Sequence, residues 1–162
     1  MLNSEIDNAR AKMDRFAFLV GYWEGDTVVH TTDGRSILGK IRGEAKEILD
    51  GGWIEWSFEQ DPNDIVERVQ RGKYLFGWCS ARQKYAAIYF DDRGNTLVEY
   101  SSDPFDSEKI TFVGETTLTE TGDVLFEDEI SSDHTNHFRN RVHMTIDGIR
   151  HLHGTFECER KA

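Results

Sequence analysis

The sequence predicts a mainly β protein: a closed antiparallel up-and-down barrel of about ten strands, preceded by one short α-helix. Short apolar stretches recur along the chain, glycine-containing turn sequences separate them, and proline occurs only twice. Because most of these turns are tight, neighbouring strands pair antiparallel, and closing such a meander leaves no strand edge exposed. No linker or low-complexity tract divides the chain, so we expect residues 1–162 to form a single domain.

The N-terminal residues predict the helix. Ser4, followed three residues later by Asp7, is typical of a helix N-cap. Apolar residues then recur at roughly helical spacing, at Ile6, Ala9, Met13 and Phe16. We expect this helix to lie across one end of the barrel.

Strands follow from Gly21 onward. We predict them at about 21–30, 36–49, 52–60, 72–80, 84–91, 96–102, 109–119, 124–132, 137–146 and 149–159. The turn sequences are Asp33-Gly34, Asp50-Gly51-Gly52, Arg93-Gly94-Asn95, Thr121-Gly122-Asp123 and Asp147-Gly148. Each supplies a residue that tolerates positive φ, as tight hairpins require.

Side-chain alternation in two hairpins predicts the inner surface of the barrel. Around Asp50-Gly51-Gly52, one face carries Ile41, Gly43, Ala45, Glu47 and Leu49 opposite Ile54, Trp56 and Phe58. Around Asp147-Gly148, one face carries Phe138, Asn140, Val142, Met144 and Ile146 opposite Ile149, His151 and His153. These faces are the more apolar ones, so we expect them to point inward. A bulge at Gly154 would reverse the alternation beyond it.

Four polar residues fall on these apolar faces: Glu47, Asn140, His151 and His153. Burial raises the pKa of a carboxyl group, and a neutral imidazole nearby can share its proton. Glu47 is therefore a candidate general acid or base, with His151 or His153 as its partner. The alternative is that each residue satisfies a buried hydrogen bond or lies at the wet mouth of the barrel.

Alternating aromatic residues predict the wall of a small-molecule cavity, with simple core packing as the alternative. The candidate ligand-binding residues are Trp23, Ile41, Ile54, Trp56, Phe58, Tyr74, Phe76, Trp78, Tyr89, Phe138, Asn140, Val142 and Met144. The predicted function is binding of a small, largely apolar metabolite. A cofactor-independent cyclase, isomerase or hydratase that acts on such a metabolite is the alternative, and the sequence leaves open whether the protein is an enzyme. A homodimer through outward residues such as Trp53 and Leu152 is a third interpretation.

Composition excludes several classes of partner. The chain has 30 Asp+Glu against 19 Lys+Arg, and a formal net charge of −11, so nucleic acid and anionic membranes are disfavoured. The spacing of His151 and His153 suits some metal sites, but no third ligand follows at close spacing, and we expect no metal. No apolar stretch is long enough to span a bilayer, the first residues do not resemble a signal peptide, and Cys79 and Cys158 lack CxxC spacing. We expect a reduced, cytoplasmic protein.

Several motifs resemble those of a known family. Phe18-Leu19-Val20-Gly21-Tyr22-Trp23-Glu24-Gly25, Ile48-Leu49-Asp50-Gly51-Gly52, the stretch from Tyr85 to Asp91, and Phe156-x-x-x-Arg160 are similar to the DUF1579 family, a lipocalin-like branch of the calycin barrels. The resemblance covers most of residues 16–160 and implies a closed antiparallel barrel with an internal cavity. It implies no common activity and no catalytic residue.

Gly21-x-Trp23-x-Gly25 is also similar to the opening motif of the haem-binding nitrobindins. In that family a histidine late in the barrel ligates the iron, so this weaker resemblance implies haem as a possible cofactor with His151 or His153 as its ligand. Asp26-Thr27 departs from the glycine-rich run that continues the nitrobindin motif.

Overall fold

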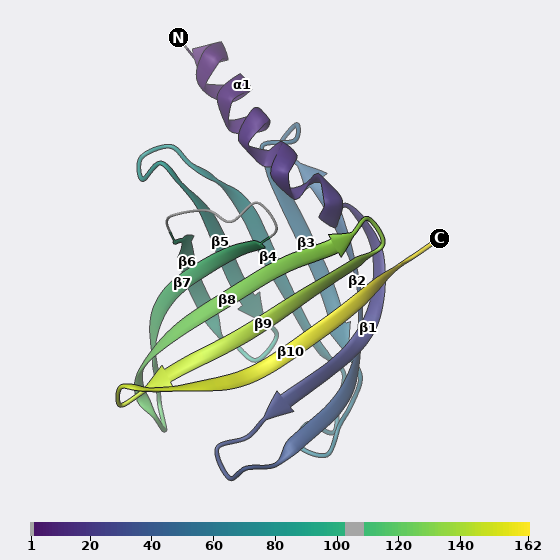
Figure 1. Cartoon of the computed structure of the whole chain (residues 1–162), viewed down its shortest axis with the longest axis vertical. Helices are drawn as coiled ribbons and strands as arrows, with labels where there is room; N and C mark the ends of the chain where they lie inside the picture. Colours follow the sequence, from purple (N-terminus) through teal and green to yellow (C-terminus); the bar gives the residue numbers. More distant parts are fainter. Residues whose placement is uncertain (1, 103–108) are drawn as a thin grey trace.

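The protein is a closed antiparallel barrel of ten strands with a helical segment at one end (Figure 1). The computed structural model describes residues 2–102 and 109–162. The helical segments are α1 (Leu2–Met13) and the 3-10 helix η1 (Asp14–Leu19). The strands are β1 (Gly21–His30), β2 (Ser36–Ile48), β3 (Trp53–Gln60), β4 (Gln70–Cys79), β5 (Lys84–Asp91), β6 (Thr96–Ser101), β7 (Lys109–Leu118), β8 (Gly122–His134), β9 (His137–Ile146) and β10 (Ile149–Lys161).

Each strand pairs with its neighbours in the chain, and β1 also pairs with β10, which closes the barrel. The predicted fold class is confirmed, and the predicted strands differ from the observed ones only by a few residues at their ends. The β9–β10 turn also has the predicted form, since Asp147 and Gly148 both adopt positive φ, 50° and 77°.

The N-terminal helix does not lie across the barrel end as expected. α1 projects away from the barrel (Figure 1), and Ile6 on it is exposed. The short η1 covers the end instead, where Phe16 and Leu19 are buried together with Met13, the last residue of α1. Apolar residues are concentrated in this later stretch, so this stretch packs on the core while the more polar turns before it stay in solvent.

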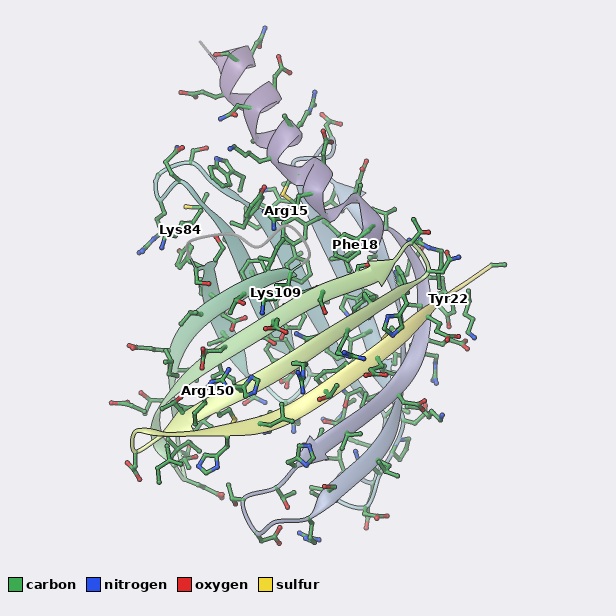
Figure 2. The ribbon with its side chains drawn as sticks, in the orientation of Figure 1. Arg15, Phe18, Tyr22, Lys84, Lys109 and Arg150 are labelled. Carbon is green, nitrogen blue, oxygen red and sulfur yellow. The ribbon has the colours of Figure 1, made fainter. Side chains whose placement is uncertain are left out.

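Arg160 on β10 connects the N-terminal segment to the barrel at this end. Its guanidinium lies 4.4 Å from the ring centroid of Trp23, and its Nη2 donates hydrogen bonds to the carbonyls of Phe18 at 2.7 Å and Thr135 at 3.1 Å. Trp23 Nε1 donates to the carbonyl of Leu19 at 2.7 Å. Figure 2 labels Phe18 at this end, where the N-terminal segment joins the barrel. These contacts join the chain before β1 to the last strand, so the end is plugged.

Glycines opposite large aromatic side chains let the rings pack directly against the backbone of the neighbouring strand. Gly43 on β2 and Gly72 on β4 both pair with Phe58 on β3. A Cβ on Gly72 would lie 2.5 Å from the Phe58 ring. The ring therefore lies over the glycine, as the alternation of small and large residues predicts.

Within residues 2–102 and 109–162, no helix is long and apolar enough to cross a membrane. Cys79 and Cys158 are free thiols.

Candidate functional site

The inside of the barrel contains a cavity of about 590 Å³. Leu19 from η1 lines its inner end. At the opposite end it is lined by the β5–β6 turn, including Arg93 and Asn95, and by Thr116–Leu118 before the β7–β8 turn. The cavity therefore has a floor at the plugged end and a mouth between these two turns. Its size is that of a site for a small organic molecule.

One wall of the cavity consists of aromatic rings on adjacent strands. Tyr74 and Phe76 on β4 are stacked, with ring centroids 5.4 Å apart and planes 4° apart. Phe58 on β3 is stacked with Tyr89 on β5 at 6.4 Å and 16°. Rings in such parallel arrangements present a broad, flat apolar surface to the lumen.

Two carboxyl groups lie within this apolar interior. Glu99 on β6 is 0% exposed and Asp128 on β8 is 2% exposed, and both line the cavity. Asn140 Nδ2 donates to Asp128 Oδ1 at 3.1 Å, and the Tyr74 hydroxyl donates to Asp128 Oδ2 at 3.4 Å. Neither oxygen of Glu99 accepts a hydrogen bond from an N–H or O–H donor in the described part of the chain. The two acids therefore have unlike surroundings.

Their surroundings make the pair retain a proton. Burial raises the pKa of Glu99 to about 11, and the negative charge of Asp128 and a hydrogen bond to it act in the same direction. Burial also raises the pKa of Asp128, but hydrogen bonds from Glu99, Asn140 and Tyr74 oppose that rise. The pKa of both acids is thus raised, and the pair retains a proton, which Glu99 holds beside Asp128. Two coupled acids that share a proton thus face the same lumen.

The mouth of the cavity is polar. His153 is the extra residue of a β-bulge in β10, between the paired residues Leu152 and Gly154, and it lines the cavity. Burial lowers the pKa of His153, and the positive charges of His30 and Arg93 lower it further, so the imidazole is neutral near pH 7. Its ring lies edge-on to Phe126, with centroids 6.5 Å apart.

Arg93 at this rim is held by Asp91. The Arg93 Nη2 lies 3.1 Å from Asp91 Oδ2, and the Tyr89 hydroxyl donates to the same oxygen at 2.8 Å. Burial alone would raise the pKa of Asp91, but hydrogen bonds from Asn95, Tyr89 and Arg93 lower it to about 2. The rim carboxylate is therefore ionised, and it neutralises the guanidinium.

The prediction that Glu47 points into the lumen is wrong. Glu47 pairs with Ile54, which was predicted on the same face, but its side chain is exposed. The β1–β2 pairing ends at Gly21 and Ala45, so Glu47 lies beyond the end of the barrel wall. Its carboxylate lies beside its own turn, where a Cβ on Gly51 would be 3.7 Å from Oε2.

The prediction for His151 is wrong for the same reason. His151 pairs with Met144 as predicted, yet it is exposed. β1 pairs with β10 only as far as Gly154, so the tip of the β9–β10 hairpin extends past the barrel. His153 was expected opposite Val142, but the bulge places Gly154 there. No group of three or more His, Cys, Asp or Glu side chains that could hold a metal ion occurs in the part of the chain that the structure describes.

Most of the predicted wall residues do line the cavity: Ile41, Trp56, Phe58, Tyr74, Phe76, Tyr89, Phe138, Asn140, Val142 and Met144. Three do not. Trp23 is fully buried under Arg160, Ile54 is buried beside it in the core, and Trp78 lies 4.8 Å from the Lys12 ammonium at the plugged end. All three belong to the closed end of the barrel rather than to its lumen.

Sequence reasoning missed Glu99 and Asp128, although one of them carried a signal. Val124, Phe126, Asp128 and Ile130 share one face of β8, and Glu127 and Glu129 lie on the other, which marks Asp128 as an acid on an inner face. In β6 both faces carry apolar residues, Leu97 on one and Val98 on the other, so alternation does not place Glu99.

Solved structures share this fold at low sequence identity. Rv2717c from M. tuberculosis is 12% identical with a TM-score of 0.67, and the match covers 93% of this chain and 97% of that one. The S-type phycobiliprotein lyase CPES from Guillardia theta is 14% identical with a TM-score of 0.60, covering 94% and 91%. These likenesses agree with the closed barrel fold that the strand pairing shows. No family model and no curated protein matches the sequence, so the resemblance to DUF1579 stays a prediction.

Proposed function

We propose that this protein binds a small, largely apolar molecule inside the barrel. The observation that supports the proposal is the cavity of about 590 Å³, which has a stacked aromatic wall and a few polar groups at defined positions. A molecule that fills it exchanges water for aromatic surface, and each Å² of apolar surface removed from water contributes about 25 cal/mol. The proposal requires no cofactor, and haem ligation by His153 stays a prediction.

Titration with the neutral fluorescent probe N-phenyl-1-naphthylamine tests this proposal. We expect the probe to bind and its emission to rise and shift to the blue. In Met144→Trp the larger side chain occupies the lumen near the mouth, so binding should be lost. Thr145→Trp, on the outer face of the same strand, is the matched control and should bind like the parent. Failure of the parent to bind, or equal binding by both variants, would contradict the proposal.

A second candidate function is cofactor-independent acid–base catalysis on a bound apolar molecule, by a cyclase, isomerase or hydratase reaction. Glu47 and His151 lie outside the cavity, so this candidate now rests on Asp128 as the base and Glu99 as the acid. The observation that favours it is that two coupled acids with raised pKa values line one cavity.

A generic proton-transfer substrate tests the second candidate without knowledge of the natural one. In 5-nitrobenzisoxazole, a carboxylate removes the carbon-bound proton while the N–O bond breaks and its electron pair goes to oxygen, which gives a cyanophenolate. We expect the parent to accelerate this elimination and Asp128→Asn to lose the acceleration. Equal rates in the two proteins would remove Asp128 as a base.

A further inference from the structure

The acid pair that lines the cavity has hydrogen-bonding capacity that the described protein residues do not use. Asp128 accepts from Asn140 and Tyr74, whereas both oxygens of Glu99 are buried without an N–H or O–H donor in residues 2–102 and 109–162. When Glu99 donates its proton to Asp128, its other oxygen is still an acceptor without a donor among these residues, on a side chain that lines the cavity. Leaving such a group unpaired is costly, so the ligand is expected to supply a donor.

The charge around the pair also selects the donor. The basic side chains that line the cavity, within the described residues, are Arg93 and His153, and both lie at the mouth. Arg93 is already paired with Asp91, and His153 is neutral. A carboxyl pair that shares one proton carries one negative charge in a low-dielectric lumen, and one positive charge compensates it. The net charge of −11 attracts cations from a distance.

We infer that the ligand is a flat aromatic molecule bearing a protonated nitrogen, whose N–H groups donate to Glu99 and Asp128 while its ring system packs against Tyr74, Phe76 and Tyr89. This inference rests on the proposed function and specifies its ligand class. The stacked rings favour a planar scaffold, and the two acids favour a cationic head on it.

Three probes with the same ring system separate the head group from the scaffold: 2-naphthylmethylammonium, 2-naphthylmethanol and 2-naphthoate. Affinities are measured by isothermal calorimetry or naphthalene fluorescence at pH 7. Because a hydrogen bond that involves a charged group is stronger than a neutral one, the ammonium should bind roughly tenfold or more tightly than the alcohol, with the carboxylate weakest. In Glu99→Gln and Asp128→Asn this preference should largely disappear while the alcohol still binds.

The control is Glu127→Gln, which removes one carboxylate adjacent to Asp128 but from the outer surface, where Glu127 is paired with Arg150 at 2.8 Å. Arg150 is labelled on this side of the molecule in Figure 2. The control should keep the full preference for the ammonium. Equal binding of the three probes by the parent would overturn the inference and leave the proposed function standing. Binding of none of them would overturn both. Loss of the preference in Glu127→Gln would assign it to overall charge and also overturn the inference.

Discussion

Glu99→Gln replaces the buried acid by a neutral side chain of the same shape, and its effect on stability should depend on pH. In the folded protein the pKa of Glu99 is raised from 4.5 to about 11 by burial and by Asp128. In the unfolded chain the same carboxyl ionises near 4.5. Between these two values the folded state binds one proton more than the unfolded state. The free energy of unfolding of the parent therefore falls as pH rises.

The size of this effect follows from one proton. The contribution of Glu99 is fully present below pH 4.5 and is lost as pH rises toward 11, at about 1.4 kcal/mol per pH unit within that window. Glutamine does not titrate, so the variant lacks this slope. Between about pH 5.5 and about pH 7.5, the free energy of unfolding of the variant should therefore rise by roughly 2.7 kcal/mol relative to that of the parent.

Urea unfolding followed by tryptophan fluorescence and far-ultraviolet circular dichroism measures this difference at each pH. Glu127→Gln, whose carboxylate lies on the outer surface beside Arg150, should follow the pH dependence of the parent. A difference between Glu99→Gln and the parent that stays constant with pH would mean that Glu99 is ionised in the folded protein, and the proton-sharing pair would be refuted.

Three further substitutions test the contacts that hold the site and the barrel. Asn140→Ala removes the donor 3.1 Å from Asp128, so the free energy of unfolding should fall by about 1–3 kcal/mol in urea titrations; an unchanged midpoint would mean that this bond contributes nothing. Gly25→Ala would place a methyl group 2.7 Å from the carbonyl carbon of Glu157 on the paired strand, and thermal unfolding should show a loss of roughly 1–3 kcal/mol or more, whereas parent-like stability would disprove the close approach. Arg160→Met keeps the aliphatic stem but removes the bonds to the N-terminal segment, and we expect a loss of roughly 1–3 kcal/mol together with faster hydrogen exchange in residues 14–20; unaltered exchange there would contradict the proposed fastening.

The sequence predicts the strands and their pairing well, because turn chemistry and two-residue alternation are local properties. The shared face of Glu47 and Ile54 and the pairing of His151 with Met144 were both predicted correctly. Alternation gives the face of a strand but not how far along the barrel a residue lies. That depth depends on where the neighbouring strand β1 ends. Its pairing with β2 ends at Gly21 and its pairing with β10 ends at Val29, and both limits follow from the stagger of the closed barrel.

The acid pair illustrates the opposite limit. Asp128 lies on a cleanly alternating strand and was within reach of the sequence argument, whereas Glu99 lies on a short strand that is apolar on both faces. Even with both placed inward, β6 and β8 are not adjacent in the barrel, so no hairpin register brings the two acids together. Their meeting depends on the curvature of the closed sheet, which residue patterns do not encode.

The closure of one barrel end by η1 and Arg160 has a consequence for how a ligand enters the cavity. Leu19 lines the closed end of the cavity, so we expect the proposed ligand to enter and leave at the other end, between the turns beside Arg93. Glu99 and Asp128 lie further inside than this mouth. The proposed ligand is therefore expected to enter with its charged group first and its rings behind. A molecule with a charge at both ends would have to place its second charge among the side chains at the mouth. The proposed binding cavity, closed at one end, is therefore expected to select ligands by the position of the charge along the molecule as well as by their hydrophobicity.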